Sequence, residues 1–252
     1  MTNYSIAEEY TLPSKGKIYS SNVNPVIKLR SMTTEEEMKR LAYSERPYKN
    51  LCEIIDDCMV EPCGISSYDM CIADYQFLLH KLRIVTYGSD YTTGSTCPYC
   101  QSVNQHNMNL SELPVIEADD EVIKNYTEFT LPKTGHKIQL RVQTPRMVDN
   151  VTVENNELKR KSKGLSTDNT FILTLRSLVE KVDGNVIDPI KKENFLRKLP
   201  MMDTNYIMKH AQKLVESFGL DTSVVNKCPM CGLDYTSHFR ITAEFFGPSL
   251  DI

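Results

Sequence analysis

Two short cysteine motifs carry the clearest chemical signal in this sequence. CPYC spans residues 97–100, and CPMC spans residues 228–231. A CxxC turn aims two thiolates at one point, and two such turns supply the four sulfur ligands of a tetrahedral zinc site, with Zn–S bonds of ~2.3 Å. The sequence therefore predicts one structural Zn²⁺ per chain. Its predicted ligands are Cys97, Cys100, Cys228 and Cys231.

The separation of the two motifs is unusual for a zinc site. Simple zinc ribbons separate their pairs by about 15–20 residues, whereas nearly the whole second half of this chain lies between residues 100 and 228. A shared metal would therefore join distant segments. Closing a loop of this size constrains the unfolded chain by roughly 4–5 kcal/mol. Metal binding adds to that, because an unfolded chain has no preformed site.

Redox chemistry is the main alternative for these cysteines. CPYC is also the active-site tetrapeptide of glutaredoxin-like proteins, whose first cysteine needs a helix N-terminus to stabilise its thiolate. Residues 101–107 would form a poor amphipathic helix, and redox chemistry leaves the second motif unexplained. Plain free thiols are the third interpretation. His106 and His238 could each replace a cysteine ligand, but four thiolates already suffice, so we expect both at polar surface positions.

The other residues capable of chemistry form no comparable pattern. The basic run at residues 158–163 is predicted to be a solvated helix end, and the acidic run at 119–121 a polar loop. A four-thiolate site leaves no open position for a substrate, and the sequence lacks known catalytic motifs. It therefore predicts a protein that is not an enzyme. Four further cysteines are expected to be buried as small hydrophobic side chains. They are Cys52, Cys58, Cys63 and Cys71.

The bulk composition is that of an ordinary globular protein. Its 252 residues can bury a core, and 29 basic against 33 acidic side chains leave a net charge of −4. General nucleic-acid binding needs a basic surface, and a membrane span needs ~20 apolar residues; we expect neither kind of partner. Residues 1–10 lack the features of a signal peptide. We therefore predict folding in a cytoplasm, where thiols stay reduced.

Periodicity and turn residues predict a mixture of helices and short antiparallel strands. A turn at residues 11–16 and a strand at 24–30 lead to a helix capped by Thr33 or Thr34, each with a glutamate three residues on. The last predicted helix is capped by Asp203 and ended by Gly219. Predicted helices span 35–46, 48–60, 67–86, 146–161, 171–182 and 203–218; strands are expected at 103–110 and 235–246, and a hairpin at 129–142.

The predicted fold class is α+β, with helices, short antiparallel strands and hairpins, and a zinc site split between two cysteine pairs. We expect residues 1–252 to form one compact unit, with a hairpin-plus-helix part at 1–95 and a zinc-linked α/β part at 96–252. The C-terminal aromatic residues either pack on the core beside the zinc site or form a docking tail for a neighbouring subunit. They are Phe239, Phe245 and Phe246.

The sequence also contains one internal similarity. Thr-Leu-Pro occurs at residues 11–13 with Gly16 after it, and again at 130–132 with Gly135 after it. Each copy is followed by a Leu-Arg pair and a threonine, and each predicts a hairpin followed by a helix. This similarity is either the trace of a duplicated half or a chance match.

Several motifs together resemble one protein family. Residues 12–16 (LPSKG) and 29–33 (LRSMT) open the pattern. It continues at residues 182–184 (VDG), 195–203 and 228–231 (CPMC), and it ends at Phe245-Phe246. The chain resembles the baseplate hub proteins of T-even-like contractile-tailed bacteriophages, the gene-twenty-six type. The resemblance is most specific from Val182 to Phe246.

The resemblance implies a structural component of the hub region of a phage baseplate, found in the virion tail and assembled in the host cytoplasm. It implies multiple copies, other baseplate and tail proteins as partners, and no catalytic residues. A tail-assembly chaperone that leaves before the virion matures is the main alternative. A zinc-ribbon nucleic-acid-binding protein and a glutaredoxin-like enzyme are further alternatives.

Overall fold

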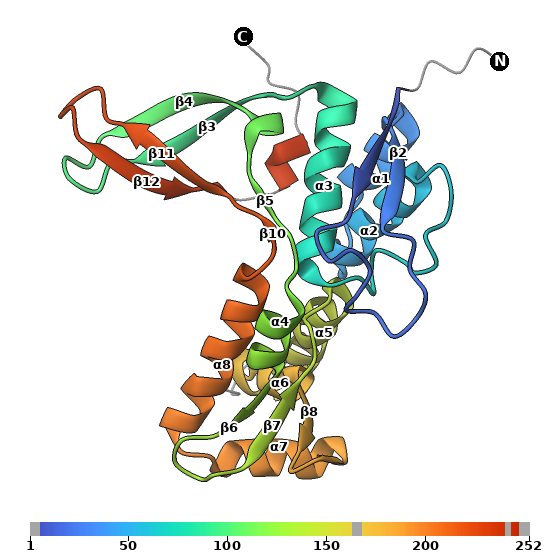
Figure 1. The fold of residues 1–252 in the computed structure, drawn as a ribbon, viewed down its shortest axis with the longest axis vertical. Coiled ribbons are helices and arrows are strands. Elements are labelled where there is room, and N and C mark those ends of the chain that lie inside the picture. The colour runs from blue at the N-terminus through green and yellow to red at the C-terminus, as the bar shows by residue number, and fades with distance from the viewer. Residues whose placement is uncertain (1–5, 163–167, 240–242, 247–252) are drawn as a thin grey trace.

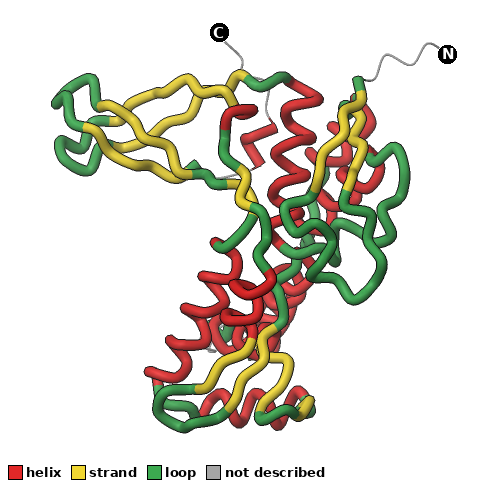
Figure 2. The backbone as a smooth tube through the Cα atoms, in the orientation of Figure 1, coloured by secondary structure: helices red, strands yellow, loops and turns green. Residues whose placement is uncertain are grey.

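The computed structural model describes residues 6–162, 168–239 and 243–246. In these ranges the chain forms eight α-helices and five small antiparallel sheets, four of two strands and one of four (Figures 1 and 2). The predicted α+β class with short antiparallel strands is confirmed. None of the described helices is both long enough and apolar enough to cross a membrane.

The helices cluster in the body of the molecule, and four strands form an arm that projects from it (Figure 1). The α-helices are α1 Thr34–Leu41, α2 Pro47–Cys58, α3 Ile72–Tyr87, α4 Asp120–Thr127, α5 Pro145–Lys161, α6 Thr170–Leu178, α7 Pro189–Lys198 and α8 Met201–Glu216; the 3₁₀ helices are η1 Leu110–Glu112 and η2 Ala243–Phe246. The strands are β1 Ala7–Thr11, β2 Val26–Arg30, β3 Asp90–Thr96, β4 Val103–Asn109, β5 Val115–Ile116, β6 Glu128–Thr130, β7 Lys137–Leu140, β8 Val179–Val182, β9 Asn185–Val186, β10 Gly219–Leu220, β11 Ser223–Lys227 and β12 Asp234–His238.

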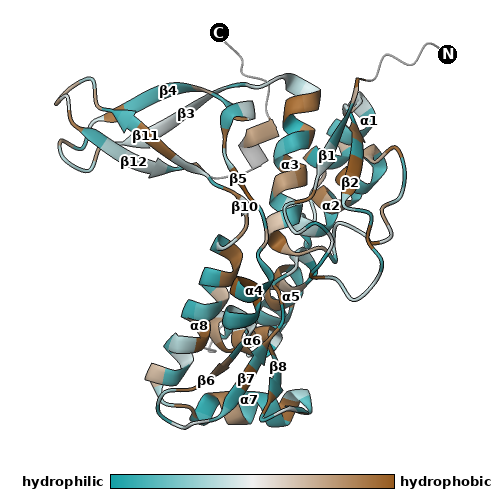
Figure 3. Cartoon of the chain, viewed as in Figure 1, coloured by the Kyte–Doolittle hydropathy of each residue, from teal (hydrophilic) through white to brown (hydrophobic). Residues whose placement is uncertain are grey.

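Two apolar cores hold the body together. The upper core surrounds α3, whose Leu78 and Leu82 are fully buried against the β1–β2 hairpin and α2. The lower core lies between α6, α8 and the β6–β9 sheet, and it includes Leu175 and Ile207. Figure 3 shows brown, apolar segments along α3, whereas the strands of the arm are mostly teal or pale, with brown on part of β11 and at the outer end of β4. The body is therefore stabilised by burial of apolar surface, whereas the arm is mostly polar.

The start of α1 follows the predicted capping pattern. The Thr33 side chain accepts a hydrogen bond from the Glu35 amide at 3.3 Å, and the Thr33 amide donates to the Glu36 carboxylate at 2.7 Å. This reciprocal capping box satisfies amide groups that have no partner inside the helix. Thr33 rather than Thr34 is the N-cap.

The segment predicted as one helix over residues 171–182 divides into two elements. Helix α6 ends at Leu178, and Val179–Val182 form β8, which pairs with β7 in the four-stranded sheet. Val179 and Val182 are both buried. A short apolar run does not distinguish a buried helix from a buried strand, so the sheet partner determines the boundary.

Other predicted boundaries also need correction. Helix α1 ends at Leu41, well before residue 46, and α3 begins at Ile72 rather than 67. The acidic run predicted as a loop starts α4, where Asp119 is the N-cap and accepts a hydrogen bond from the Val122 amide at 2.9 Å. The final predicted strand is shorter, ending at His238, and residues 240–242 lie outside the described residues. Helices α4 and α7 were not predicted.

Two hairpin turns far apart in the sequence bind a carboxylate in the same way. The Ser14 amide donates to Asp74 Oδ1 at 3.0 Å, and the Lys133 amide donates to Asp203 Oδ1 at 2.9 Å. Each aspartate is fully buried and is the third residue of its helix, α3 or α8. The prediction that Asp203 is the N-cap of α8 is therefore wrong. Its side chain binds the turn before β7 instead.

The equivalence of the two turns extends to the side chains around them. Tyr10 of β1 lies edge-on to Phe77 of α3, with ring centroids 6.4 Å apart, and Phe129 of β6 lies edge-on to Tyr206 of α8 at 5.6 Å. In both helices, a nitrogen-bearing side chain four residues further on packs against both rings. These side chains are Lys81 and His210. The two Thr-Leu-Pro segments thus occupy equivalent places in two similarly arranged halves.

The C-terminal aromatic residues pack on the upper core. Phe245 and Phe246 of η2 are buried, as is Phe239 directly after β12. The guanidinium of Arg83, on α3, donates from Nε to the Phe245 carbonyl oxygen at 3.0 Å. These residues therefore belong to the core, as one interpretation expected, but they lie at the base of the arm and not beside the cysteine pairs.

His80 of α3 is a polar side chain in this same core. It is fully buried and stacks on Phe245, with ring centroids 6.3 Å apart. Among the described residues, neither of its ring nitrogens has a hydrogen-bond partner of normal geometry, although the backbone of Leu110 lies near enough to oppose part of the pKa shift. Burial, together with the positive charge of neighbouring Lys81, lowers the pKa of His80 to about 4. The folded protein therefore holds this imidazole in its neutral form.

We expect His80 to make the fold sensitive to mild acid. Its pKa is lower in the folded than in the unfolded chain, so the unfolded chain binds the proton first and stability falls as pH drops from about 6.5 towards 4. The free energy of unfolding should fall by about 3 kcal/mol over the whole interval. Urea unfolding of wild type and His80→Leu at pH 7.5 and 4.5 measures it. The variant should lose clearly less stability than wild type over this interval, and equal losses would contradict the assignment.

Candidate metal centre

Two hairpins form the arm, and each carries one cysteine motif at its outer turn. Strands β3 and β4 pair from Asp90 opposite Asn109 to Thr96 opposite Val103, and β11 and β12 pair from Ser223 opposite His238. The two hairpins lie side by side and project away from the helices (Figure 1). The fold thus brings together two segments separated by most of the second half of the chain.

The four predicted sulfur ligands converge at the end of the arm. Cys97 Sγ lies 3.8 Å from Cys231 Sγ, and Cys100 Sγ lies 3.6 Å from Cys228 Sγ. All four sulfurs lie within 4.8 Å of one another. A tetrahedron with metal–sulfur bonds of ~2.3 Å has sulfur–sulfur edges of about 3.8 Å, whereas a disulfide needs about 2.05 Å. The spacing therefore fits four thiolates around one metal ion.

Each cysteine turn is shaped by matching backbone hydrogen bonds. The Gln101 amide donates to the Cys97 carbonyl oxygen, and the Gly232 amide donates to the Cys228 carbonyl oxygen, both at 2.9 Å. Gln101 and Gly232 both adopt positive φ angles, 63° and 73°. Glycine takes this conformation without strain, which accounts for its place after the second motif. These turns direct both sulfurs of each pair towards the other hairpin.

Polar groups from the first hairpin surround two of the sulfurs. Ser102 Oγ lies 3.2 Å from Cys100 Sγ and 3.3 Å from Cys228 Sγ, and Asn104 Nδ2 donates to Cys228 Sγ at 3.7 Å. The Ser102 hydroxyl, helped by backbone amides of the second turn, lowers the pKa of Cys228 to about 5. The hydrogen bond with the Leu233 backbone is outweighed by burial and the neighbouring sulfurs, which raise the pKa of Cys231 to about 12. The thiolate is the form that binds a metal, so a cation among the four sulfurs would be needed for all of them to ionise.

Tyr235 fills the space between the hairpins just behind the sulfurs. Its hydroxyl lies 2.7 Å from Ser95 Oγ and 3.0 Å from His106 Nε2, and it accepts a hydrogen bond from Asn104 Nδ2 at 3.3 Å. His106 thus contacts this hydroxyl, and the group of converging ligand atoms contains only the four cysteines. His238 lies at the far end of β12, beside a recess in the body.

The arm has almost no apolar interior of its own. The only apolar cluster between the hairpins that the described residues show consists of Cys97, Cys228 and Tyr235. Small units with little buried apolar surface usually need a metal or a disulfide to stay folded. A metal ion bound by both turns would supply the missing link between the two hairpins.

The remaining cysteines are buried in the body. Cys52, Cys58 and Cys63 lie in the upper core, and Cys71 lies at the start of α3 in a smaller neighbouring cluster. Burial raises the pKa of Cys52 and of Cys58 to about 12. In the part of the chain that the structure describes, the four arm cysteines are the only group arranged to hold a metal.

The setting of Cys97 does not match a glutaredoxin-like thiol. Cys97 follows β3 in a hairpin turn, and it is not at a helix N-terminus, which that chemistry needs. The second motif occupies a matching turn after β11 and contributes sulfurs to the same cluster. The arrangement is therefore suited to binding a metal rather than to disulfide exchange.

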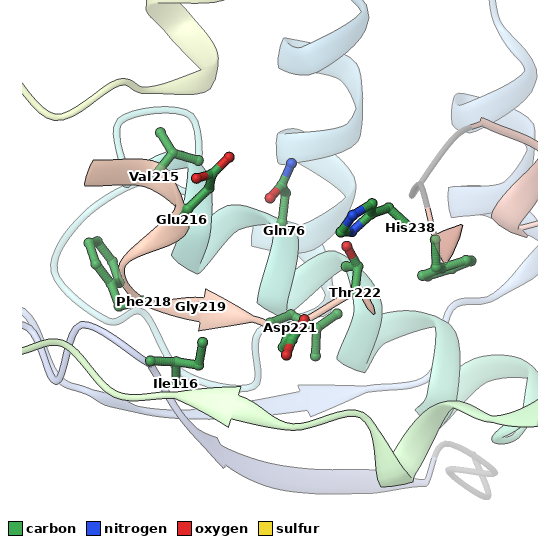
Figure 4. A pocket seen from close by; sticks show the side chains of 11 residues that line it. Gln76, Ile116, Val215, Glu216, Phe218, Gly219, Asp221, Thr222 and His238 are labelled. Carbon is green, nitrogen blue, oxygen red and sulfur yellow. The ribbon is translucent and has the colours of Figure 1, made fainter. Parts of the chain in front are cut away.

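A recess of about 550 Å³ lies where the arm joins the body (Figure 4). Gln76, Thr222 and His238 line it together with acidic and apolar side chains. One of its acidic groups, Asp221, accepts hydrogen bonds from the Ser223 amide at 2.9 Å and the Ser223 hydroxyl at 2.7 Å. This carboxylate therefore shapes the turn into β11.

Comparison with known protein families gives a match that covers nearly the whole chain. A family model described as T4 bacteriophage base plate protein matches residues 3–247. No curated protein and no solved structure matches the chain.

Loss of the exposed sulfur ligands should loosen the arm and leave the body folded. In a Cys100→Ser/Cys231→Ser double variant, we expect amide hydrogen exchange in the strands of the arm to rise at least tenfold, because the hairpins would then be joined mainly by the polar contacts of Tyr235. Helices α3 and α8 should keep their protection. Thr92→Ser, in the same arm, is the matched control. Unchanged exchange in the arm of the double variant would contradict the structural role.

Proposed function

We propose that this chain, which belongs to the T4 bacteriophage base plate protein family, is a structural subunit of the hub region of a contractile-tail base plate. The family match over residues 3–247 is the observation that carries the proposal. The hub assignment rests on the short motifs that resemble the gene-twenty-six type. In this role the chain acts through contacts with other base plate and tail proteins, in multiple copies, within the virion tail after assembly in the host cytoplasm.

The proposed cofactor is one structural Zn²⁺ bound by the four arm cysteines. Four thiolates form a soft, tetrahedral donor set that suits zinc, and iron is the other metal that such a set commonly holds. Four ligands would fill the coordination sphere and leave no position for a substrate. The metal's role would be to fix the two hairpins against each other and to hold the arm in one shape.

A structural role agrees with the chemistry of the described residues. A metal ion bound by all four sulfurs would have no open coordination position for a substrate. We therefore propose that the chain is not an enzyme.

The two alternative functions differ from this proposal in whether the chain is present in the mature tail and in what it binds. A tail-assembly chaperone would assist assembly and leave, so it would be missing from mature tails. A zinc-ribbon nucleic-acid-binding protein would need a basic face, yet residues 91–109 of the arm include no lysine or arginine. We therefore propose no nucleic-acid partner and no membrane partner.

Metal analysis tests the cofactor. Untagged protein purified without chelator should contain about one zinc per chain, and Cys228→Ser should reduce this at least tenfold, because Cys228 is buried among the other ligands. Cys63→Ser, in the upper core, should retain the zinc. Inductively coupled plasma mass spectrometry gives the ratio. Wild-type protein without metal, or retention of zinc by Cys228→Ser, would refute the assignment.

Mass spectrometry of purified tails tests the structural role. Tails isolated from mature virions of the phage that encodes this chain should contain it at a fixed ratio to other base plate proteins. A chaperone would instead be found in infected-cell extracts and be missing from the tails. That second result would replace the structural proposal with the chaperone.

A further inference from the structure

The end of the arm exposes four large apolar side chains. Tyr99 and Met230, which hold the same position in the two cysteine motifs, are 62% and 78% exposed, and Val103 and Leu233 just beyond the motifs are 78% and 49% exposed. Single exposed apolar residues are normal on protein surfaces, but a concentration of them marks an interaction site. Here all four lie in or beside two turns whose sulfurs converge. We refer to these four residues as the arm tip.

The surface around the arm tip is poor in charge. The chain has 62 charged side chains in 252 residues, yet residues 91–109 include none of them, and residues 222–234 include only Lys227 and Asp234, which are opposite each other in the β11–β12 hairpin and carry opposite charges. Charged side chains normally keep exposed surfaces from associating. The buried centres of protein–protein interfaces are depleted in charge and enriched in tyrosine and methionine. The composition of the arm tip is therefore that of an interface centre.

The exposed side chains of the arm tip are not needed to hold the hairpins together. Contacts between the hairpins come from the sulfur cluster and from the polar groups around Tyr235. Tyr99 and Met230 sit on the outside of turns whose shape is set by backbone hydrogen bonds. A site whose backbone is already fixed loses little conformational freedom on binding, so these turns are well suited to present apolar side chains to a partner.

From this placement we propose that the arm tip inserts into an uncharged, apolar recess on another base plate protein. The inference rests on the proposed structural function. Electrostatic complementarity favours such a recess, because burying a charged group against a neutral tip leaves that charge without a partner. Nucleic acid would need cations at the tip.

The test compares two pairs of substitutions in phage tails. A phage lacking its own copy of this gene is supplied with wild-type protein, with Tyr99→Ser/Met230→Ser, or with Val186→Ser/Ile190→Ser. The last pair removes comparably exposed apolar residues from β9 and α7, away from the arm. We expect the tip variant to keep its zinc content and melting temperature but to be incorporated into tails at least tenfold less than wild type. The control variant should be incorporated like wild type.

Each other outcome overturns the proposal in a recognisable way. Equal incorporation of the tip variant and wild type would show that the tip is not a docking site, with the structural function intact. Absence of wild-type protein from tails would remove the structural function and this inference together. Sedimentation showing a wild-type dimer that the tip variant loses would reassign the tip to a second copy of the chain. Wild-type flotation with phosphatidylglycerol vesicles, lost in the variant, would reassign it to a membrane surface.

Discussion

Two polar hairpins do not stay together in water unless something other than apolar burial joins them. The body has extensive cores, but between the hairpins of the arm only Cys97, Cys228 and Tyr235 form an apolar contact among the described residues. A metal ion bound where the four sulfurs converge would therefore be the interaction on which the shape of the arm depends. It would connect the strand that leaves α3 with the strands that follow α8, and so it would also fix how the two halves of the chain meet at that end.

The sequence was most informative where chemistry is local. The cysteine motifs, the capping box at Thr33 and the hairpin turn after Leu131 each depend on neighbouring residues, and the structure forms all three as predicted. The sequence was least informative where a residue's secondary structure or hydrogen-bond partner depends on a segment far away in the chain. Val179 joins a sheet because β7 lies beside it, and Asp203 binds the turn of another hairpin rather than its own helix end. Neither partner can be identified from adjacent residues.

The two halves of the chain resemble each other more in role than in residue identity. Asp74 and Asp203 are identical and bind equivalent turns, but the pair Phe77 and Tyr206 keeps only the aromatic character of its position. Lys81 and His210 share only a nitrogen-bearing side chain. Because these equivalent positions hold different residues, the two halves show only weak sequence similarity even where their side chains pack alike. The Thr-Leu-Pro segments are noticeable because a tight turn tolerates few alternatives.

The long separation of the two cysteine motifs also has a consequence during synthesis. Cys228 follows Cys97 by 131 positions, and ribosomes add about 5–20 residues per second. The first pair of thiols therefore waits roughly 7–26 seconds before the second pair leaves the ribosome. Until then it can offer a metal ion only two of the four ligands. A nascent chain interrupted in this interval cannot complete the site, so a filled site reports that translation has passed the second motif.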